Sequence, residues 1–214
     1  MTGTAQRTRL PRAEREQQVL AAAGALFADR GYGAVTMDDV AAAVGVTKPL
    51  LYAYFGNKER LYLACMEPAA QELREAVAGA VAQAERPADA LELGVQAFFE
   101  FVDRDRDAWR VLFDETLPAG GEVARRVAGD RERLEAVVAR LVVARLPGRR
   151  RGRAAVEVEA LSTALLGAAE SLARWWLRTG ALSAGQAAAL LIETVEPGLR
   201  ARATPRTRSA GEAR

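Results

Sequence analysis

Residues 36–58, TMDDVAAAVGVTKPLLYAYFGNK, decide the fold that this sequence predicts. Thr36 can cap a helix, and Asp39 follows three residues later, where the acid of a capping box stands. Apolar residues then recur at roughly helical spacing as far as Gly45. Glycine is the natural end of this helix because it takes the left-handed C′ conformation without strain.

A second short helix follows the first after a tight turn. Thr47 can cap it, and Pro49 is tolerated because the amides of a first helical turn have no partner within the helix. We expect this helix to run from Lys48 to about Phe55 and to end at Gly56. Two short helices joined in this way predict a helix-turn-helix, whose second helix can enter the major groove of DNA.

Composition excludes several classes of function. The chain has 214 residues, half of them hydrophobic, which is enough for a small domain and a larger one. It contains no histidine, so we expect no enzyme built on histidine chemistry, no metal site of the usual kind and no cofactor. The single Cys65 excludes an internal disulfide and fits a reducing cytoplasm, where we expect it to be buried and inert. No apolar run is long enough to span a membrane.

Working outward from the central stretch, the pattern is helical throughout. We expect a polar arm at 1–11, a helix at 12–30, and a helix capped by Asn57 that runs to about residue 84 and is bent or broken at Pro68. Further helices are expected at 88–103, 108–117, 122–146, 154–178 and 184–195, with the last one capped by Ser183 and Gln186 and stopped by Pro197. The Arg-rich loop 147–153 and the polar tail 200–214 complete the chain. The sequence therefore predicts an all-α fold of about nine helices.

The central stretch also resembles a known family. Its pattern T-x-x-x-V-A-x-x-V-G-V-T-x-x-x-L-Y-x-Y-F-x-N-K-x-x-L is similar to the signature of tetracycline-repressor-type (TetR-family) transcription regulators, and the resemblance covers about residues 12–66. Val44, Pro49 and Tyr54 depart from the usual residues, so no operator sequence is implied. The resemblance implies a helix-turn-helix DNA-binding domain at 12–66 and a helical bundle for effector binding and dimerisation at 67–199.

The helix-turn-helix supplies the candidate DNA contacts. Lys48 at the start of the recognition helix is suited to guanine, and Pro49 or Leu50 could pack on a thymine methyl group. Other members would hold phosphates and fix the register. The full candidate set is Thr36, Thr47, Lys48, Pro49, Leu50, Tyr52, Tyr54 and Lys58.

The last two long helices supply a candidate dimer interface. Small residues allow helices to approach closely, and leucines supply the burial. A two-fold dimer on a palindromic site is expected because one reading head covers little DNA. The alternative is a helix pair buried within one subunit. The candidate residues are Leu161, Ala164, Leu165, Ala168, Leu172, Leu190 and Leu191.

Aromatic residues gather in the second domain, where the resemblance implies an effector pocket. Core packing is the alternative for such residues. Glu170 is the one charge between Ala160 and Ala173; it could pair with Arg174 or line the pocket and bind a cation or hydroxyl group. The candidate ligand-binding residues are Phe98, Phe101, Trp109, Leu112, Phe113, Leu166, Glu170 and Trp175.

These patterns predict a cytoplasmic, homodimeric transcription regulator that is not an enzyme. We expect a repressor that binds a palindromic operator in double-stranded DNA and is released by a small lipophilic effector, which could be cationic. Two alternatives stay open. One is a regulator with a solid C-terminal core that needs no effector, and the other is an all-α carrier of lipophilic compounds.

Overall fold

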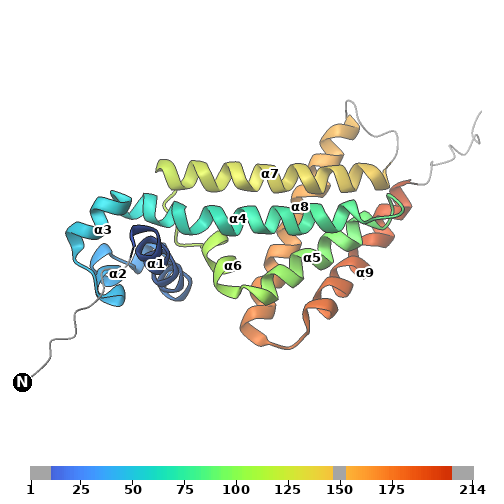
Figure 1. The fold of residues 1–214 in the computed structure, drawn as a ribbon. Helices are drawn as coiled ribbons and strands as arrows, with labels where there is room; N and C mark the ends of the chain where they lie inside the picture. The colour runs from blue at the N-terminus through green and yellow to red at the C-terminus, as the bar shows by residue number, and fades with distance from the viewer. Residues whose placement is uncertain (1–10, 147–152, 204–214) are drawn as a thin grey trace, which may run out of the picture. The chain divides into compact units, whose positions relative to one another are not determined.

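The computed structural model describes residues 11–146 and 153–203, which form nine α-helices and no strand (Figure 1). They divide into two compact units. Unit 1 contains residues up to Gln71 together with Asp107–Ala128, and unit 2 contains Glu72–Arg106 and the residues from Gly129 onward. Unit 1 thus includes a segment, Asp107–Ala128, that lies outside the domain predicted at 12–66.

Unit 1 begins with three helices: α1 (Arg12–Ala34), α2 (Met37–Val44) and α3 (Lys48–Phe55). The apolar stripe predicted for α1 is buried at Val19, Ala23 and Phe27. Val40 of α2 and Leu51 of α3 are fully buried with them. The three helices therefore share one small core, which fixes the direction in which α3 presents its other faces.

The two signals that define α2 behave as predicted. The Asp39 amide donates to Thr36 Oγ1 at 3.2 Å, and Asp39 Oδ2 accepts from the Thr36 amide at 2.8 Å, which completes a capping box. Gly45 ends the helix with φ 69° and ψ 38°, in the left-handed region. Helix α3 differs at its start, because Thr47 occupies the N-cap position without a side-chain capping hydrogen bond.

A later segment of the chain holds the end of α1. The Tyr32 amide donates to Asp114 Oδ2 at 2.5 Å, and the Gly33 amide donates to Thr116 Oγ1 at 3.1 Å. Both acceptors follow α6 (Arg106–Leu112), the short helix of this segment. The Tyr62 hydroxyl also donates to the carbonyl of Val111. These bonds explain why α6 and the following loop belong to unit 1.

Two helices are shared by the units. Helix α4 (Lys58–Ala82) passes from unit 1 to unit 2 at Gln71, and α7 (Gly121–Arg145) passes at Ala128. Unit 2 is completed by α5 (Ala90–Arg104), α8 (Arg153–Thr179) and α9 (Ala184–Ala203). Helix α5 packs mainly on α9, and both contact α8. The buried face of α5, with Phe99, Phe101 and Val102 fully covered, forms the centre of this bundle.

The stop predicted at Pro197 is wrong, and the helix that was expected to bend or break at Pro68 is not broken there. Helix α4 continues through Pro68, and α9 continues through Pro197 as far as Ala203. In both helices buried apolar residues follow the proline: Leu73 and Val77 in α4 and Leu199 in α9. Burial of these side chains offsets the missing backbone hydrogen bond, which alone would break an isolated helix.

The other helix boundaries agree with the prediction to within a few residues, and the second capping box, between Ser183 and Gln186, is present. The predicted arm at 1–11 and loop at 147–153 lie almost wholly outside the described residues. The predicted tail begins too early, since α9 includes residues 200–203. In the part of the chain that the structure describes, no helix is long and apolar enough to cross a membrane.

Candidate nucleic-acid interface and apolar cavity

The recognition helix α3 presents an accessible outer face because its inner face is fixed by Leu51, which is fully buried. Five of the eight candidate DNA contacts are exposed: Thr36, Thr47, Lys48, Pro49 and Tyr52. The other three, Leu50, Tyr54 and Lys58, are half-buried. Helices α2 and α3 therefore bring most of the predicted set to one accessible end of unit 1.

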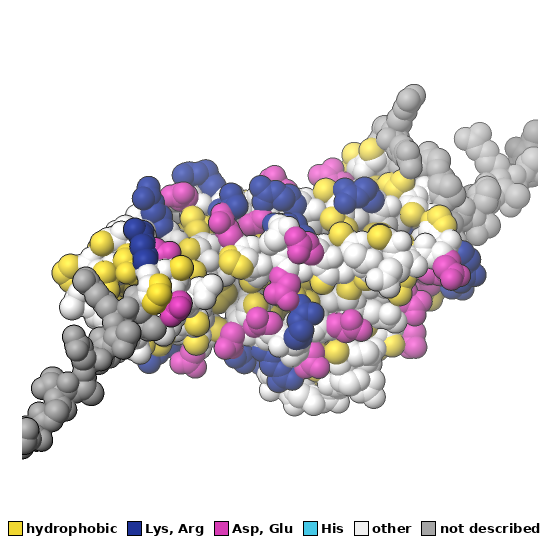
Figure 2. Space-filling view, viewed as in Figure 1, with side chains coloured by type: hydrophobic (Ala, Val, Ile, Leu, Met, Phe, Trp, Pro, Cys, Tyr) yellow, Lys and Arg dark blue, Asp and Glu magenta, His cyan; other side chains and the backbone are white. Residues whose placement is uncertain are grey.

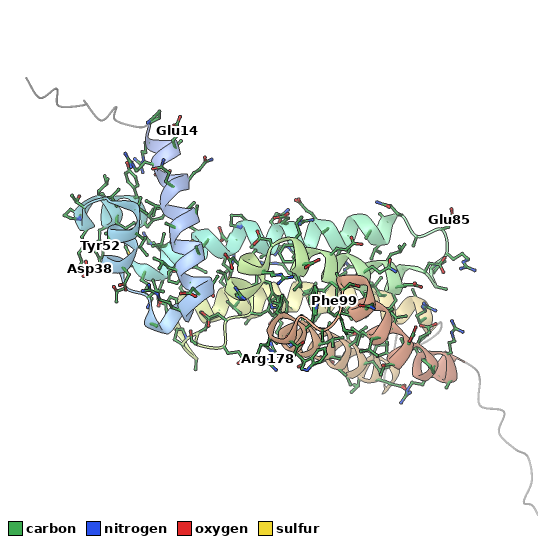
Figure 3. All side chains as sticks on the ribbon, turned by 90° about the horizontal axis from the view of Figure 1, so that it is seen from below. Glu14, Asp38, Tyr52, Glu85, Phe99 and Arg178 are labelled. Atoms are coloured by element: carbon green, nitrogen blue, oxygen red, sulfur yellow. The ribbon has the colours of Figure 1, made fainter. Side chains whose placement is uncertain are left out.

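Lys48 carries an interaction that the sequence analysis did not anticipate. Its Nζ lies 2.8 Å from Asp38 Oδ2 in the first turn of α2, and both side chains are more than half exposed. The hydrogen bond to Asp38 raises the pKa of Lys48, so the side chain stays protonated at neutral pH. Figure 3 labels Asp38 on α2 and Tyr52 on α3. An acid in the first turn of α2 was the signal that could have identified this pair.

Two other candidates are held by aromatic contacts. The Tyr54 ring lies 5.1 Å from the guanidinium carbon of Arg12, which brings the start of α1 to the end of α3. Lys58 Nζ lies 4.2 Å from the centre of the Tyr32 ring, and burial lowers the pKa of this lysine. Both are cation–π geometries. The Lys58 ammonium therefore lies against the Tyr32 ring and is half-buried, whereas a phosphate contact would place it in solvent at the start of α4.

Thr36 is also committed within the protein. Its hydroxyl donates to Asp39 Oδ2 at 2.6 Å, so its one proton points to the capping box. The hydrogen bonds from Thr36 lower the pKa of Asp39, which keeps the carboxylate ionised. Thr36 thus stabilises the start of α2. Because its hydroxyl proton is already donated, the Thr36 oxygen can only accept a hydrogen bond, and a phosphate, which is also an acceptor, would need a bridging donor between them.

Unit 2 contains an apolar cavity of about 40 Å³. Helices α4, α5, α7 and α8 each contribute to its wall. The lining residues are Val77, Leu91, Gly94, Val95, Phe98, Leu134, Val138, Leu141, Leu165, Leu166 and Ala169. Every one is aliphatic or aromatic apart from Gly94, where an added Cβ would lie 3.2 Å from Leu141. A wall without polar groups suits a hydrocarbon part of a ligand.

The aromatic residues chosen from the sequence are mostly elsewhere. Phe98 and Leu166 line the cavity, whereas Phe101, Leu112 and Trp175 are not among its lining residues. Trp109 and Phe113 belong to unit 1 and stack on each other, with ring centres 3.8 Å apart. The better signal was the spacing of aliphatic residues on α5 and α7, at 91, 94, 95 and 98 and at 134, 138 and 141.

Glu170 has a partner that the sequence analysis did not consider. It is nearly buried, and its Oε1 lies 2.6 Å from Nη1 of Arg131 on α7. Glu170 is not among the cavity's lining residues, although its neighbours Leu166 and Ala169 are. The structure thus gives Glu170 an ion pair between α7 and α8, which neither sequence-based interpretation, a pair with Arg174 or a ligand group in the pocket, includes.

Helices α8 and α9 also form a shallow groove of about 370 Å³. Four of the seven candidate dimer residues line it: Leu161, Ala164, Leu165 and Ala168. Leu190 is exposed, Leu172 is half-buried, and Leu191 is buried within the subunit. Trp175, chosen as a ligand contact, is also 39% exposed on α8. Small and apolar side chains thus remain accessible along these two helices.

The accessible α3, packed on α2 as a helix-turn-helix, makes this a DNA-binding transcription regulator. Two family models match the chain: bacterial regulatory proteins of the tetR family over residues 19–65, and the tetracyclin repressor-like C-terminal domain over residues 84–199. The second match alone covers more than half of the chain. The protein belongs to the TetR family, whose members regulate transcription and are not enzymes.

Relatives support the same conclusion. The HTH-type transcriptional activator FasR of Mycolicibacterium smegmatis is 33% identical over 175 residues, which is 82% of this chain and 78% of that protein. A TetR-like transcriptional regulator from Rhodococcus sp. RHA1 is 33% identical, with a TM-score of 0.74 over 89% of this chain and 98% of that one. AibR, solved with isovaleryl coenzyme A and operator DNA, shares the fold at 23% identity, with a TM-score of 0.69 over 84% of this chain and 97% of that one.

Proposed function

We propose that this protein is a cytoplasmic, homodimeric regulator that binds a palindromic operator and leaves it when a lipophilic effector occupies unit 2. The observation that carries the proposal is the apolar cavity in the same chain as an accessible recognition helix. A solid core would leave a DNA-binding protein without a means of response. A cavity gives the bundle two packing states, with and without ligand.

The groove on α8 and α9 supports dimerisation. Its lining combines the small residues Ala164, Ala168 and Gly198 with the apolar Leu161 and Leu199. Small side chains on a helix allow a second pair of helices to approach closely, and burial of the neighbouring leucines would stabilise the contact. A dimer formed here would carry two recognition helices, which must lie about 34–36 Å apart, or a multiple of that, to enter successive major grooves on one side of DNA.

The small size of the cavity supports a mechanism in which the effector widens the cavity and thereby releases the protein from DNA. An engineered cavity of about 150 Å³ is the size that admits benzene, and this cavity measures about 40 Å³. Any effector with a hydrocarbon part larger than a few atoms must push the walls apart. Interiors are densely packed, so the displacement is passed to the helices that form the wall.

Helix α4 is suited to carry that displacement. Val77, in its unit 2 part, lines the cavity, while Leu61 and Tyr62, in its unit 1 part, are fully buried in the core of the DNA-binding unit. A helix is stiff along its length, so a shift at Val77 would reach the residues that position α3. A coupling free energy of about 1–3 kcal/mol would lower operator affinity roughly 5- to 150-fold.

The wall favours a neutral hydrocarbon group over a cationic one. Glu170, the acid that could have neutralised a cation, already faces Arg131. We therefore propose an effector with an acyl chain or a neutral aromatic group in the cavity. The complex of AibR with isovaleryl coenzyme A is one instance of an acyl compound bound by a protein of this fold.

The test uses duplex DNA selected by the protein from a random-sequence library. Anisotropy would be measured with acyl thioesters, neutral aromatics and alkylammonium ions, for wild type, Ala169→Leu and the control Ala78→Leu. Ala169 lines the cavity, whereas Ala78 is exposed on α4. We expect one neutral class to release wild type and Ala78→Leu, and to leave Ala169→Leu bound. Release of all three variants alike would place the effector elsewhere, and no release at all would favour a regulator without an effector.

Activation is a second candidate outcome because the M. smegmatis relative is named an activator. The same operator-binding protein blocks transcription or supports it according to where its site lies relative to the promoter. A reporter gene driven by the native promoter that carries the selected site, with and without the protein, would separate the two. We expect repression, and increased expression from the native promoter would establish activation.

A further inference from the structure

The pair formed by Asp38 and Lys48 joins the starts of the two helices of the motif, α2 and α3, on the side of unit 1 that the proposed function places against DNA. Nζ and Oδ2 lie 2.8 Å apart, with side-chain exposures of 51% for Lys48 and 66% for Asp38. An exposed ion pair of this kind contributes little to stability. A carboxylate on a surface that meets phosphates is also unfavourable for binding unless it has a partner on the DNA. Its position therefore calls for a role in recognition.

The geometry of the pair matches the edge of one base pair. In the major groove, guanine presents the acceptors N7 and O6, and cytosine presents the donor N4 amino group. O6 and N4 are hydrogen-bonded to each other, so they are about 2.9 Å apart. The protein presents a donor and an acceptor at nearly the same separation, 2.8 Å. The ammonium can face O6 while the carboxylate faces N4, and the pair need not be broken.

We propose that Asp38 is a specificity-determining residue, which reads one G·C base pair of each operator half-site jointly with Lys48. Asp38 holds the ammonium at the head of α3 and accepts a hydrogen bond from cytosine N4, while Lys48 donates to guanine. The inference rests on the operator binding proposed above.

The donor side decides which base pair is preferred. Lys48 has three N–H donors, and guanine offers O6 and N7 side by side. A T·A pair in the same orientation also offers an acceptor next to a donor, but thymine places its methyl group where guanine has N7. Reversing the base pair places the carboxylate against O6 or O4 and repels it. One orientation of G·C is therefore favoured over the other three arrangements.

The carboxylate also affects DNA of any sequence. While it neutralises Lys48, the ammonium contributes less to phosphate attraction, and the carboxylate itself is repelled by phosphates. Both effects weaken binding to non-cognate DNA, because non-specific affinity depends on charge and on counterion release. Asp38 would thereby increase the ratio of specific to non-specific affinity, because it strengthens binding to the cognate base pair and weakens binding to other DNA.

The test compares Asp38→Ala, Asp38→Asn and Lys48→Ala with wild type by selection from a random duplex library, followed by affinity measurement for every single-base change in the selected site. Asparagine removes the charge and keeps a side-chain oxygen as an acceptor, and it also shows whether loss of charge alone alters folding. The matched control is Asp107→Ala. Asp107 is likewise an exposed acid in the first turn of a unit 1 helix and is paired with Arg110 at 3.2 Å.

We expect wild type and Asp107→Ala to prefer G·C at one position of each half-site by roughly 10- to 100-fold. Asp38→Ala should lose most of that preference at the same position as Lys48→Ala. Both Asp38 variants should bind random DNA more tightly, with a salt slope steeper by about one. The proposal is overturned if Asp38→Ala keeps the wild-type preference at every position. If wild type selects no sequence at all, the operator-binding proposal fails as well, which is a separate and recognisable result.

Discussion

At the scale of single residues, burial determines which ionisable groups can change charge. The Cys65 thiol points to the carbonyl oxygen of Leu20, with Sγ and O 3.6 Å apart, and burial raises its pKa from 9.0 to about 12. A buried and inert thiol is expected here from the sequence. Cys65 is only half-buried, and its raised pKa agrees with low reactivity. At neutral pH there is almost no thiolate, which is the reactive form.

This shift predicts how stability changes in alkaline solution. A raised thiol pKa means that the folded protein holds the proton more tightly than the unfolded chain. From the unfolded pKa of 9.0 upward to about 12, the free energy of unfolding should therefore fall as pH rises, by at most about 1.4 kcal/mol per pH unit from this group. Urea unfolding of wild type and Cys65→Ala at about pH 8 and about pH 10 would measure it. An equal loss in both proteins would assign the alkaline sensitivity to other groups.

The pair between Arg131 and Glu170 gives a second prediction at this scale. Arg131→Met leaves a carboxylate that is 6% exposed without its 2.6 Å partner, so we expect a loss of about 1–3 kcal/mol in the free energy of unfolding. Adding Glu170→Leu removes the buried charge and should recover most of that loss. Equilibrium unfolding of the single and double variants would show the recovery, and a double variant that is less stable than Arg131→Met would contradict this account.

At the scale of elements, Gly31 shows how closely the loop after α6 packs on the end of α1. Gly31 has φ 76°, and a Cβ built there would lie 2.7 Å from Thr116 Oγ1. With ψ 161° the residue lies in a region that is essentially restricted to glycine, so Gly31→Ala should destabilise unit 1 through the backbone strain, which costs about 1–3 kcal/mol, and through the clash. Adding Thr116→Ala should remove the clash and leave the cost of the positive φ. Because Thr116 Oγ1 also accepts from the Gly33 amide, the double variant is compared with Thr116→Ala alone.

Gly24 supplies the control for this experiment. It lies within α1 with nothing within 4 Å of an added Cβ, so Gly24→Ala should stabilise the helix by about 0.5–1 kcal/mol. Thermal unfolding of these variants is a sufficient measurement. Equal destabilisation by Gly31→Ala in the wild type and in the Thr116→Ala variant would mean that the contact with Thr116 is unimportant.

Elements also show what could be predicted from the sequence. The capping boxes at Thr36 and Ser183 were found because their partners lie three residues away. The helix end expected at Pro197 was wrong, and α4 is not broken at Pro68, because burial farther along each helix outweighs the local cost. The partner of Glu170 lies 39 residues away on another helix. Local rules hold where the interacting groups are neighbours in the chain, and they fail where packing decides.

At the scale of the whole molecule, the proposed dimer can be tested on the α8 face. Ala164 is exposed and lines the groove. Ala164→Arg would place a charge in the interface, so we expect a monomer with at least about tenfold weaker operator binding, because two linked heads bind more tightly than one. Ala136→Arg, on the exposed side of α7, is the matched control. Analytical ultracentrifugation should show a dimer for this control, and a dimer for Ala164→Arg would exclude the proposed interface.

The surface does not reveal the function at this scale. Acidic and basic side chains alternate on the face seen in Figure 2, and the net charge is +2. DNA binding was predicted from one short motif and not from overall charge. The cavity could not be predicted in the same way, because its wall combines residues of four helices. Most of the aromatic residues that the sequence offered as ligand contacts are not among its lining residues.

The three tryptophans give the protein its own optical reporters. Trp109 is buried in unit 1 against Phe113, Trp176 is buried in unit 2 and donates to the Leu182 carbonyl at 2.6 Å, and Trp175 is 39% exposed. Three variants, each with two of the tryptophans replaced by phenylalanine, would each keep a single fluorescent tryptophan. Quenching by acrylamide would then follow the DNA-binding unit, the effector unit and the α8 face separately in the same titration.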